Sequence, residues 1–302
     1  MPKHPMRRIL VTGASGMLGR TTLSELVKNS DLSVIGQAFS RIDNGLLQAD
    51  LTDPTQVAKL IKESRPDCIV HCAAERRPDI SEGNKPATDA LNQHAVATLA
   101  HHCKANNIFL IYLSTDYVFD GKDAPYSTTA IPNPLNHYGQ SKLAGEREAQ
   151  ACGDETLILR VPILYGPIQS LEESAVTTIS KHLLDKTPKP IDHWAQRYPT
   201  ATTDVARVIA QIIQYRSQHP DFHGTYHWSG NECFTKYEMA QIIGKAWELD
   251  TTHLNPDSNT PAGAPRPKDC QLDTSSLTKL GIQSYTPFSE AIASVLSPFK
   301  PQ

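Results

Sequence analysis

The feature that most constrains the fold is a set of three glycines, close to the N-terminus, between an apolar segment and an amphipathic one. Arg8–Thr12 is mostly apolar, Gly13, Gly16 and Gly19 follow at G-x-x-G-x-x-G spacing, and residues 20–28 are amphipathic. This order predicts a strand, a tight turn and a helix, the unit that places a dinucleotide pyrophosphate at a helix N-terminus. We therefore expect the chain to bind a nicotinamide dinucleotide.

Each glycine of this turn has its own expected role. Gly13 permits the tight turn, Gly16 lets the backbone approach the phosphates, and Gly19 lets the helix pack closely on the strand. The residues between them would line the same phosphate site: Ser15, Met17 and Leu18. A plain glycine-rich loop is the alternative, but the position directly after a strand favours a dinucleotide site.

Composition and charge exclude several classes of protein. The chain has 302 residues and 39% hydrophobic content, enough for a full core. Its 29 Lys plus Arg against 32 Asp plus Glu give a formal charge of −3 without a dense basic run, so we expect no nucleic-acid partner. No stretch is apolar for long enough to cross a bilayer, and the N-terminus lacks a signal-peptide core. We expect no membrane association and a cytoplasmic location.

The six cysteines are scattered and form no C-x-x-C pair. They are predicted to be reduced thiols. The run His101-His102-Cys103 has no second ligand pair at zinc spacing, so we expect no metal site.

Apolar runs alternate with helical patterns along the first half of the chain. We expect further strands at residues 33–38, 68–71, 109–114 and 156–161, and helices at 54–63, 87–106 and 138–151. This alternation, with strands that are continuous apolar runs, is typical of an α/β fold with a doubly wound parallel Rossmann sheet. We assign residues 1–165 to a nucleotide-binding Rossmann domain.

The pattern is less regular after residue 165. Prolines separate expected helices near residues 173–185, 204–215 and 237–247. We assign residues 166–302 to a smaller C-terminal substrate-binding lobe that faces a substrate or a partner.

The end of the second strand bears on the choice of nucleotide. It reads Phe39-Ser40-Arg41, with a cation where NAD-specific sites usually carry an acid. A guanidinium beside a hydroxyl suits a 2′-phosphate, which favours NADP(H). Asp43 keeps NAD(H) as the less favoured alternative, and Arg41 as a solvated loop charge is the other interpretation.

A phenol and two polar groups are candidates for catalysis. Tyr138 and Lys142 are four residues apart, on one face of an expected helix, and the ammonium would lower the pKa of the phenol so that it can donate a proton. Thr115 ends a central strand, where its hydroxyl could polarise a substrate carbonyl. Alone, a Y-x-x-x-K match can arise by chance and Ser114-Thr115-Asp116 can be a turn cap; their order after the glycine turn favours an enzyme.

These residues resemble the extended short-chain dehydrogenase/reductases. The runs Ser114 to Gly121 and Tyr138 to Glu146 are similar to those of the dTDP-4-dehydrorhamnose reductase superfamily. Within it, the chain most resembles the regulatory β subunits of methionine adenosyltransferase. That resemblance is carried by residues 73–79, 171–177, 192–194, 196–197, 227–232 and 235–240.

The resemblance implies roles for further residues. Asp50 and Leu51 would lie near the adenine, Ala73 and Ala74 along the cofactor, and Pro162 near the nicotinamide. Thr115, Tyr138 and Lys142 match the catalytic positions of the reductases. Arg266 would face the diphosphate of a sugar nucleotide, with a solvated loop arginine as the alternative.

Two functions follow from these expectations. The first is an NADPH-dependent reductase of a 4-keto sugar nucleotide, an oxidoreductase. The second is a non-catalytic regulatory subunit that binds the catalytic subunit of a methionine adenosyltransferase in S-adenosylmethionine biosynthesis. A plain NADPH-sensing module would not explain Tyr138 and Lys142, and a homo-oligomer is compatible with all three.

Overall fold

A parallel sheet of seven strands forms the centre of the computed structural model, which describes residues 6–42 and 45–301. The strand order is β10-β6-β5-β4-β1-β2-β3, and every neighbouring pair is parallel. The strands are β1 (Arg8–Thr12), β2 (Ser33–Ala38), β3 (Leu47–Gln48), β4 (Cys68–His71), β5 (Phe109–Thr115), β6 (Thr156–Val161) and β10 (Gly224–His227). The predicted doubly wound α/β fold is confirmed.

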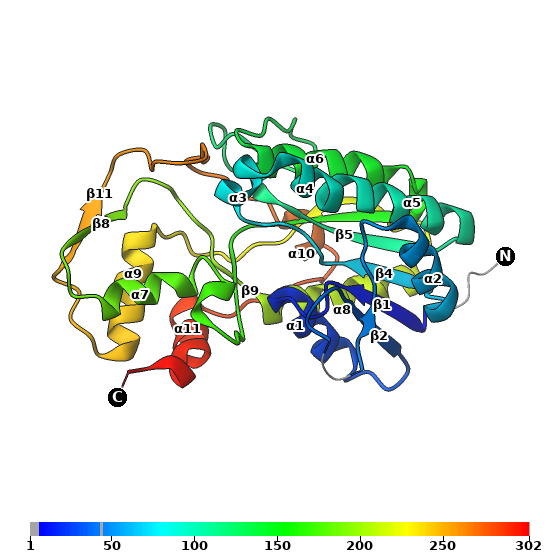
Figure 1. Ribbon diagram of the computed structural model, residues 1–302, viewed down its shortest axis with the longest axis horizontal. Coiled ribbons are helices and arrows are strands. Elements are labelled where there is room, and N and C mark those ends of the chain that lie inside the picture. The colour runs from blue at the N-terminus through cyan, green and yellow to red at the C-terminus, as the bar shows by residue number, and fades with distance from the viewer. Residues whose placement is uncertain (1–5, 43–44, 302) are drawn as a thin grey trace.

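Helices cover both faces of this sheet, as Figure 1 shows. One face packs on α1 (Met17–Leu26) and α8 (Thr202–Gln218), and the other on α2 (Pro54–Ser64), α5 (Ala95–Asn106) and α6 (His137–Gln150). All seven residues of β5 are buried, as are all four of β4. Strands covered on both faces need no polar side, which is why they read as continuous apolar runs.

The helix predicted at residues 87–106 is interrupted in the structure. After α3 (Pro78–Gly83) and α4 (Lys85–Asp89), the backbone widens into a π-helical turn at Ala90–His94 before α5 begins. Asn92 in this turn is buried, and its amide donates to the Glu75 carbonyl and to Ser141 Oγ. The wider turn therefore directs the Asn92 side chain inward, where it bonds the backbone of Glu75 in the loop after β4.

A smaller lobe lies at one end of the molecule, with its own buried apolar core. Its helices are α7 (Ser180–Leu184), α9 (Lys236–Trp247) and α11 (Phe288–Leu296), on the left of Figure 1. Two short parallel pairs belong to this part of the chain: β8 (Lys189–Asp192) with β11 (Leu254–Asp257), and β7 (Leu164–Tyr165) with β9 (Thr200–Ala201). Helix α10 (Ser275–Thr278) follows β11.

The helix predicted near residues 173–185 is wrong for most of its length. The segment forms 3₁₀ turns at Leu171–Glu173 and Thr177–Ile179, and only then the short α7. Hydroxyls compete for the backbone here: Ser174 Oγ donates to the Leu164 carbonyl and Thr177 Oγ1 to the Leu171 carbonyl. Such side-chain bonds offer the backbone an alternative to a continuous helix.

The chain after residue 165 also contributes to the sheet. β10 pairs with β6 at the edge of the sheet, and α8 packs beside α1 in the sheet core. Residue 165 therefore ends the first pass of the chain through the sheet but does not separate two independent cores. The division of residues 1–165 and 166–302 into nucleotide-binding and substrate-binding parts stays a prediction.

Among the described residues, no helix combines the length and hydrophobicity that crossing a bilayer requires.

Candidate functional site

The glycine turn after β1 leaves the N-terminus of α1 without a side-chain cap. Gly16 is the N-cap residue, and no side chain accepts a hydrogen bond from the first turn. A Cβ at Gly13, whose φ is +67°, would lie 2.7 Å from the Ala73 nitrogen, and one at Gly19 would lie 2.2 Å from the Gly13 oxygen. The turn is thus too tight for side chains at either position, and the first turn of α1, which no side chain caps, fits a pyrophosphate.

This turn opens into a cavity of about 650 Å³ along the carboxyl ends of the strands. Ligands of open α/β sheets bind at this edge. Every predicted cofactor-binding and catalytic residue lines the cavity: Gly13, Ser15, Gly16, Met17, Leu18, Gly19, Phe39, Ser40, Arg41, Asp50, Leu51, Ala73, Ala74, Thr115, Tyr138, Lys142 and Pro162. A cavity of this size and lining fits a dinucleotide.

Several lining residues were not predicted. Gln37, Arg76, Asp116 and Tyr117 are polar residues among them. Asp116 and Tyr117 follow Thr115 directly, so the strand-end position was a signal for them. Gln37 accepts from the Gly13 N–H at 3.1 Å and donates to the Ala49 carbonyl at 2.6 Å, which only the paired strands bring about.

Phe39, Ser40 and Arg41, which the sequence predicts to face the adenosine, line one part of the cavity. Arg41 pairs with Glu173, whose Oε1 lies 2.8 Å from Nη1 of Arg41. Asp43, on which the NAD(H) alternative depends, lies outside the described residues. The acid found beside Arg41 therefore comes from a segment 132 positions further along the chain.

Tyr138 and Thr115 meet in the same cavity. Asn136 caps α6 by accepting from the Gly139 N–H at 2.9 Å, which places Tyr138 in the first turn. Gly139 lets this turn approach the loop after β5, because a Cβ there would lie 2.2 Å from the Tyr117 oxygen. Burial raises the pKa of Tyr138, and its hydrogen bond with Thr115 is the strongest opposing influence.

The Lys142 ammonium contacts strand β5. Its ammonium is buried, donates to the Leu113 carbonyl at 2.7 Å and lies 4.1 Å from the centre of the Tyr112 ring. Burial lowers the pKa of Lys142 to about 7, so part of its charge is lost at neutral pH. The pKa of Tyr138 is raised in this structure and not lowered as the sequence predicted, because burial is the largest influence on it.

The buried carboxyl of Asp116 lies beside the Thr115 hydroxyl. Asp116 Oδ1 accepts from Thr115 Oγ1 at 3.0 Å, and burial raises the pKa of Asp116 to about 7 against the opposing charge of Arg197. Tyr117 packs edge-on against Tyr138, with ring centres 5.8 Å apart. The cluster can hold a proton close to the phenol at neutral pH.

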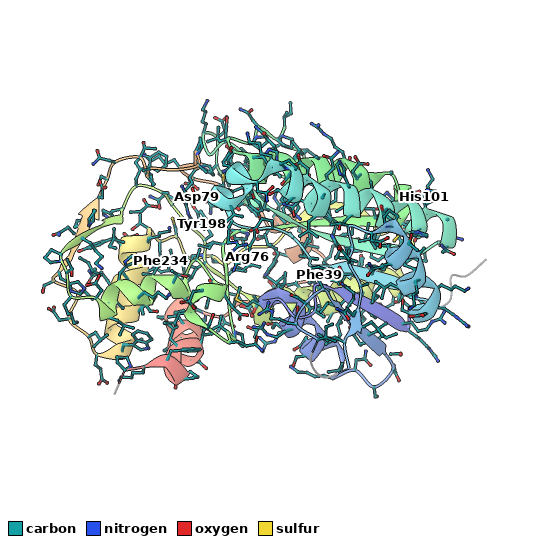
Figure 2. All side chains as sticks on the ribbon, in the orientation of Figure 1. Phe39, Arg76, Asp79, His101, Tyr198 and Phe234 are labelled. Carbon is teal, nitrogen blue, oxygen red and sulfur yellow. The ribbon has the colours of Figure 1, made fainter. Side chains whose placement is uncertain are left out.

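Arg266, the predicted substrate residue, does not line this cavity. Its Nη2 lies 2.6 Å from Oδ2 of Asp79 in α3, and its Nη1 donates to the Ala264 carbonyl at 2.9 Å. It therefore connects the lobe to the sheet part of the molecule. In Figure 2, Asp79, Arg76 and Tyr198 lie between the two parts, whereas His101 lies at the far end of the sheet part.

No metal site is found among residues 6–42 and 45–301: no three His, Cys, Asp or Glu side chains there are grouped to hold an ion.

The similarity to known proteins extends over nearly the whole chain. Residues 6–300 match the family model described as the RmlD substrate binding domain. Methionine adenosyltransferase 2 subunit beta of Mus musculus is 46% identical over 297 residues, covering 98% of this chain and 89% of that protein. A dTDP-4-keto-6-deoxy-D-glucose reductase of Streptomyces niveus is 33% identical over 251 residues, 82% of each chain.

A solved structure agrees with this family assignment. The dTDP-4-dehydrorhamnose reductase of Bacillus anthracis, in complex with NADP, superposes with a TM-score of 0.83 at 26% identity. The match covers 98% of this chain and 99% of that one.

Proposed function

This chain belongs to the RmlD substrate-binding-domain family, and from that premise we propose that it is an NADP(H)-binding reductase of a 4-keto sugar nucleotide. The supporting observation is that Thr115, Tyr138 and Lys142 line the same cavity as the uncapped N-terminus of α1. A dinucleotide site and a proton donor in one cavity are what a carbonyl reductase requires.

The residues present fit the cofactor. The uncapped α1 would hold the pyrophosphate, Arg41 and Ser40 a 2′-phosphate, and Lys142 the ribose beside the nicotinamide. When bound, NADPH would supply a hydride.

Tyr138 would supply the proton. The phenol is protonated at neutral pH, as a proton donor must be, although its raised pKa makes it a weaker acid than a free tyrosine. The adjacent Thr115 hydroxyl would hold the substrate carbonyl against it. Asp116, with a pKa of about 7, would exchange protons with the Thr115 hydroxyl that it accepts from. Arg266 would approach the diphosphate of the substrate only if its pair with Asp79 opened.

The reductase proposal is tested by NADPH oxidation with dTDP-4-dehydrorhamnose. We expect turnover by the unmodified protein and a loss of at least about 100-fold in Tyr138→Phe, because a general acid contributes about 10²–10⁴ in rate. NADPH affinity should survive the change, since the phenol donates to the substrate. Tyr285→Phe, which removes an exposed phenol outside this cavity, is the matched control. Equal activity of the Tyr138→Phe variant and the unmodified protein would contradict the proposal.

A second function is favoured by the 46% identity with a regulatory subunit. We propose as the alternative that the chain binds the catalytic subunit of a methionine adenosyltransferase and acts in S-adenosylmethionine biosynthesis without turning over a substrate. Size-exclusion chromatography of the mixed proteins tests it. A stable heteromer together with no NADPH oxidation supports this alternative, and turnover without a heteromer supports the reductase.

A further inference from the structure

One carboxylate, that of Glu173, holds both Arg41, which lines the cavity, and Arg20. Glu173, at the end of the 3₁₀ turn Leu171–Glu173, accepts through Oε1 from Nη1 of Arg41 at 2.8 Å and from Nη1 of Arg20 at 3.1 Å. Its Oε2 accepts from Nη2 of Arg20 at 2.6 Å and from the Gln169 N–H at 2.9 Å. Four donors therefore saturate a side chain that is 12% exposed.

Arg20 anchors this carboxylate to the glycine turn. Its Nη1 also donates to the Ser15 carbonyl at 2.7 Å, and its Nη2 donates to the Pro167 carbonyl at 3.3 Å. The guanidinium thus joins α1, the turn and the chain segment that contains Glu173. The position of the Glu173 carboxylate does not depend on Arg41 alone.

Arg41 differs from Arg20 in exposure and position. Its side chain is 51% exposed and lines the cavity. Burial acts to raise the pKa of Glu173, but hydrogen bonds from Arg20, Gln169 and Arg41 outweigh it and lower the pKa to about 2. The carboxylate is therefore ionised at neutral pH, and a phosphate that approaches Arg41 meets a negative charge already bound to it.

We propose that Glu173 is a specificity-determining residue that competes with the cofactor 2′-phosphate for Arg41, and so narrows the preference for NADP(H) over NAD(H). The inference rests on the proposed function, because it requires a dinucleotide in this cavity. NAD(H) has no 2′-phosphate, so its adenosine leaves the Arg41–Glu173 pair intact. NADP(H) must share Arg41 with Glu173 or break that pair, while the pair with Arg20 stays in place.

The test measures dissociation constants of NADPH and NADH by nicotinamide fluorescence on the full chain. In Glu173→Gln we expect NADPH to bind about three- to tenfold more tightly, the range that loss of one partly screened charge interaction gives, and NADH to be nearly unchanged. Glu172→Gln is the matched control, since the neighbouring carboxylate is 60% exposed and pairs with Lys181 instead. It should change neither constant.

Arg41→Ala makes the test specific to the proposed pair. It should weaken NADPH far more than NADH, and Glu173→Gln added to it should then give no gain for NADPH, because the two residues act through one contact. Thermal unfolding checks that each variant folds. If Glu173→Gln does not fold, Glu173→Ala is used in its place.

The outcomes separate the two proposals. An NADPH-to-NADH affinity ratio that is unchanged in Glu173→Gln, or that moves toward NADH, overturns the role of Glu173 while leaving the dinucleotide site standing. Failure of the unmodified protein to bind either dinucleotide overturns both.

Discussion

Asp116 is buried beside the Thr115 hydroxyl, where solvent cannot stabilise its charge. Burial raises the pKa of its carboxyl from 3.8 to about 7, although Arg197 opposes the shift. The folded protein therefore keeps a proton on Asp116 that the unfolded chain releases. Because the unfolded state binds fewer protons between about pH 4 and about pH 7, the contribution of Asp116 to stability falls as the pH rises through that window.

Asp116→Asn removes this dependence. We expect the free energy of unfolding of the variant, relative to the unmodified protein, to rise by about 1 kcal/mol or more between pH 4.5 and pH 8, because each unit of pKa shift corresponds to about 1.4 kcal/mol. Urea unfolding at the two pH values measures it. Asp31→Asn, at an exposed carboxylate, is the control. A difference that is the same at both pH values would refute a raised pKa at Asp116.

Helix α9 shows how a local signal supports the lobe. Thr235 Oγ1 accepts from the Glu238 N–H at 3.3 Å, and Glu238 Oε2 accepts from the Thr235 N–H at 2.7 Å, so the helix begins with a capping box. The same helix buries Met239, Ile243 and Trp247 in the core of the lobe. The cap therefore fixes the start of an element on which that core depends.

Thr235→Ala tests the contribution of the cap. We expect it to lower the free energy of unfolding by about 1 kcal/mol, the usual cost of losing an N-cap hydroxyl. Thr235→Ser keeps the hydroxyl and should restore most of the loss, which separates the hydrogen bond from the packing of the methyl group. Chemical denaturation of both variants gives the comparison. Equal losses in the two variants would show that the hydroxyl does not matter.

At the scale of the whole molecule, the sheet part depends on chain from both halves of the sequence. β10 forms the edge of the sheet beside β6, and α8 places Val205, Val208 and Ile212 in the same core as Ile9 of β1. Without these elements the face of the sheet beside α1 would expose apolar side chains to water. Residues 1–165 carry the sequence signals of a Rossmann domain, but part of the core of that domain comes from residues after 165.

A fragment of residues 1–165 should therefore fail to fold as a cooperative unit. We expect it to lack a sharp thermal transition and to bind a dye for exposed apolar surface, whereas the full chain shows a transition and binds little dye. Circular dichroism and dye fluorescence on both proteins measure this. A cooperative transition in the fragment would restore residue 165 as the boundary of an independent domain.

Most of the sheet could be predicted because its signals are local. The strands that the sequence predicted, β1, β2, β4, β5 and β6, are short apolar runs. The spacing of Gly13 and Gly19 predicts the tight turn, because neither position has room for a side chain. β10 was missed because Gly224–His227 is short, partly exposed and not apolar. Parallel strands end at one edge, so the predicted strand-end residues meet in one cavity once the sheet is known.

The sequence by itself determined the fold class, the glycine turn and the residues that follow each strand, since these depend on periodicity and on backbone conformation within a few positions. Only the tertiary structure decided that Glu173 meets Arg41, that Arg266 pairs with Asp79 and that the Lys142 ammonium faces Tyr112. Those contacts join segments far apart in the chain. Burial lowers the pKa of Lys142, whereas hydrogen bonds from Arg20 and Arg41 lower that of Glu173. Neither distance nor burial is recorded in any local pattern of residues.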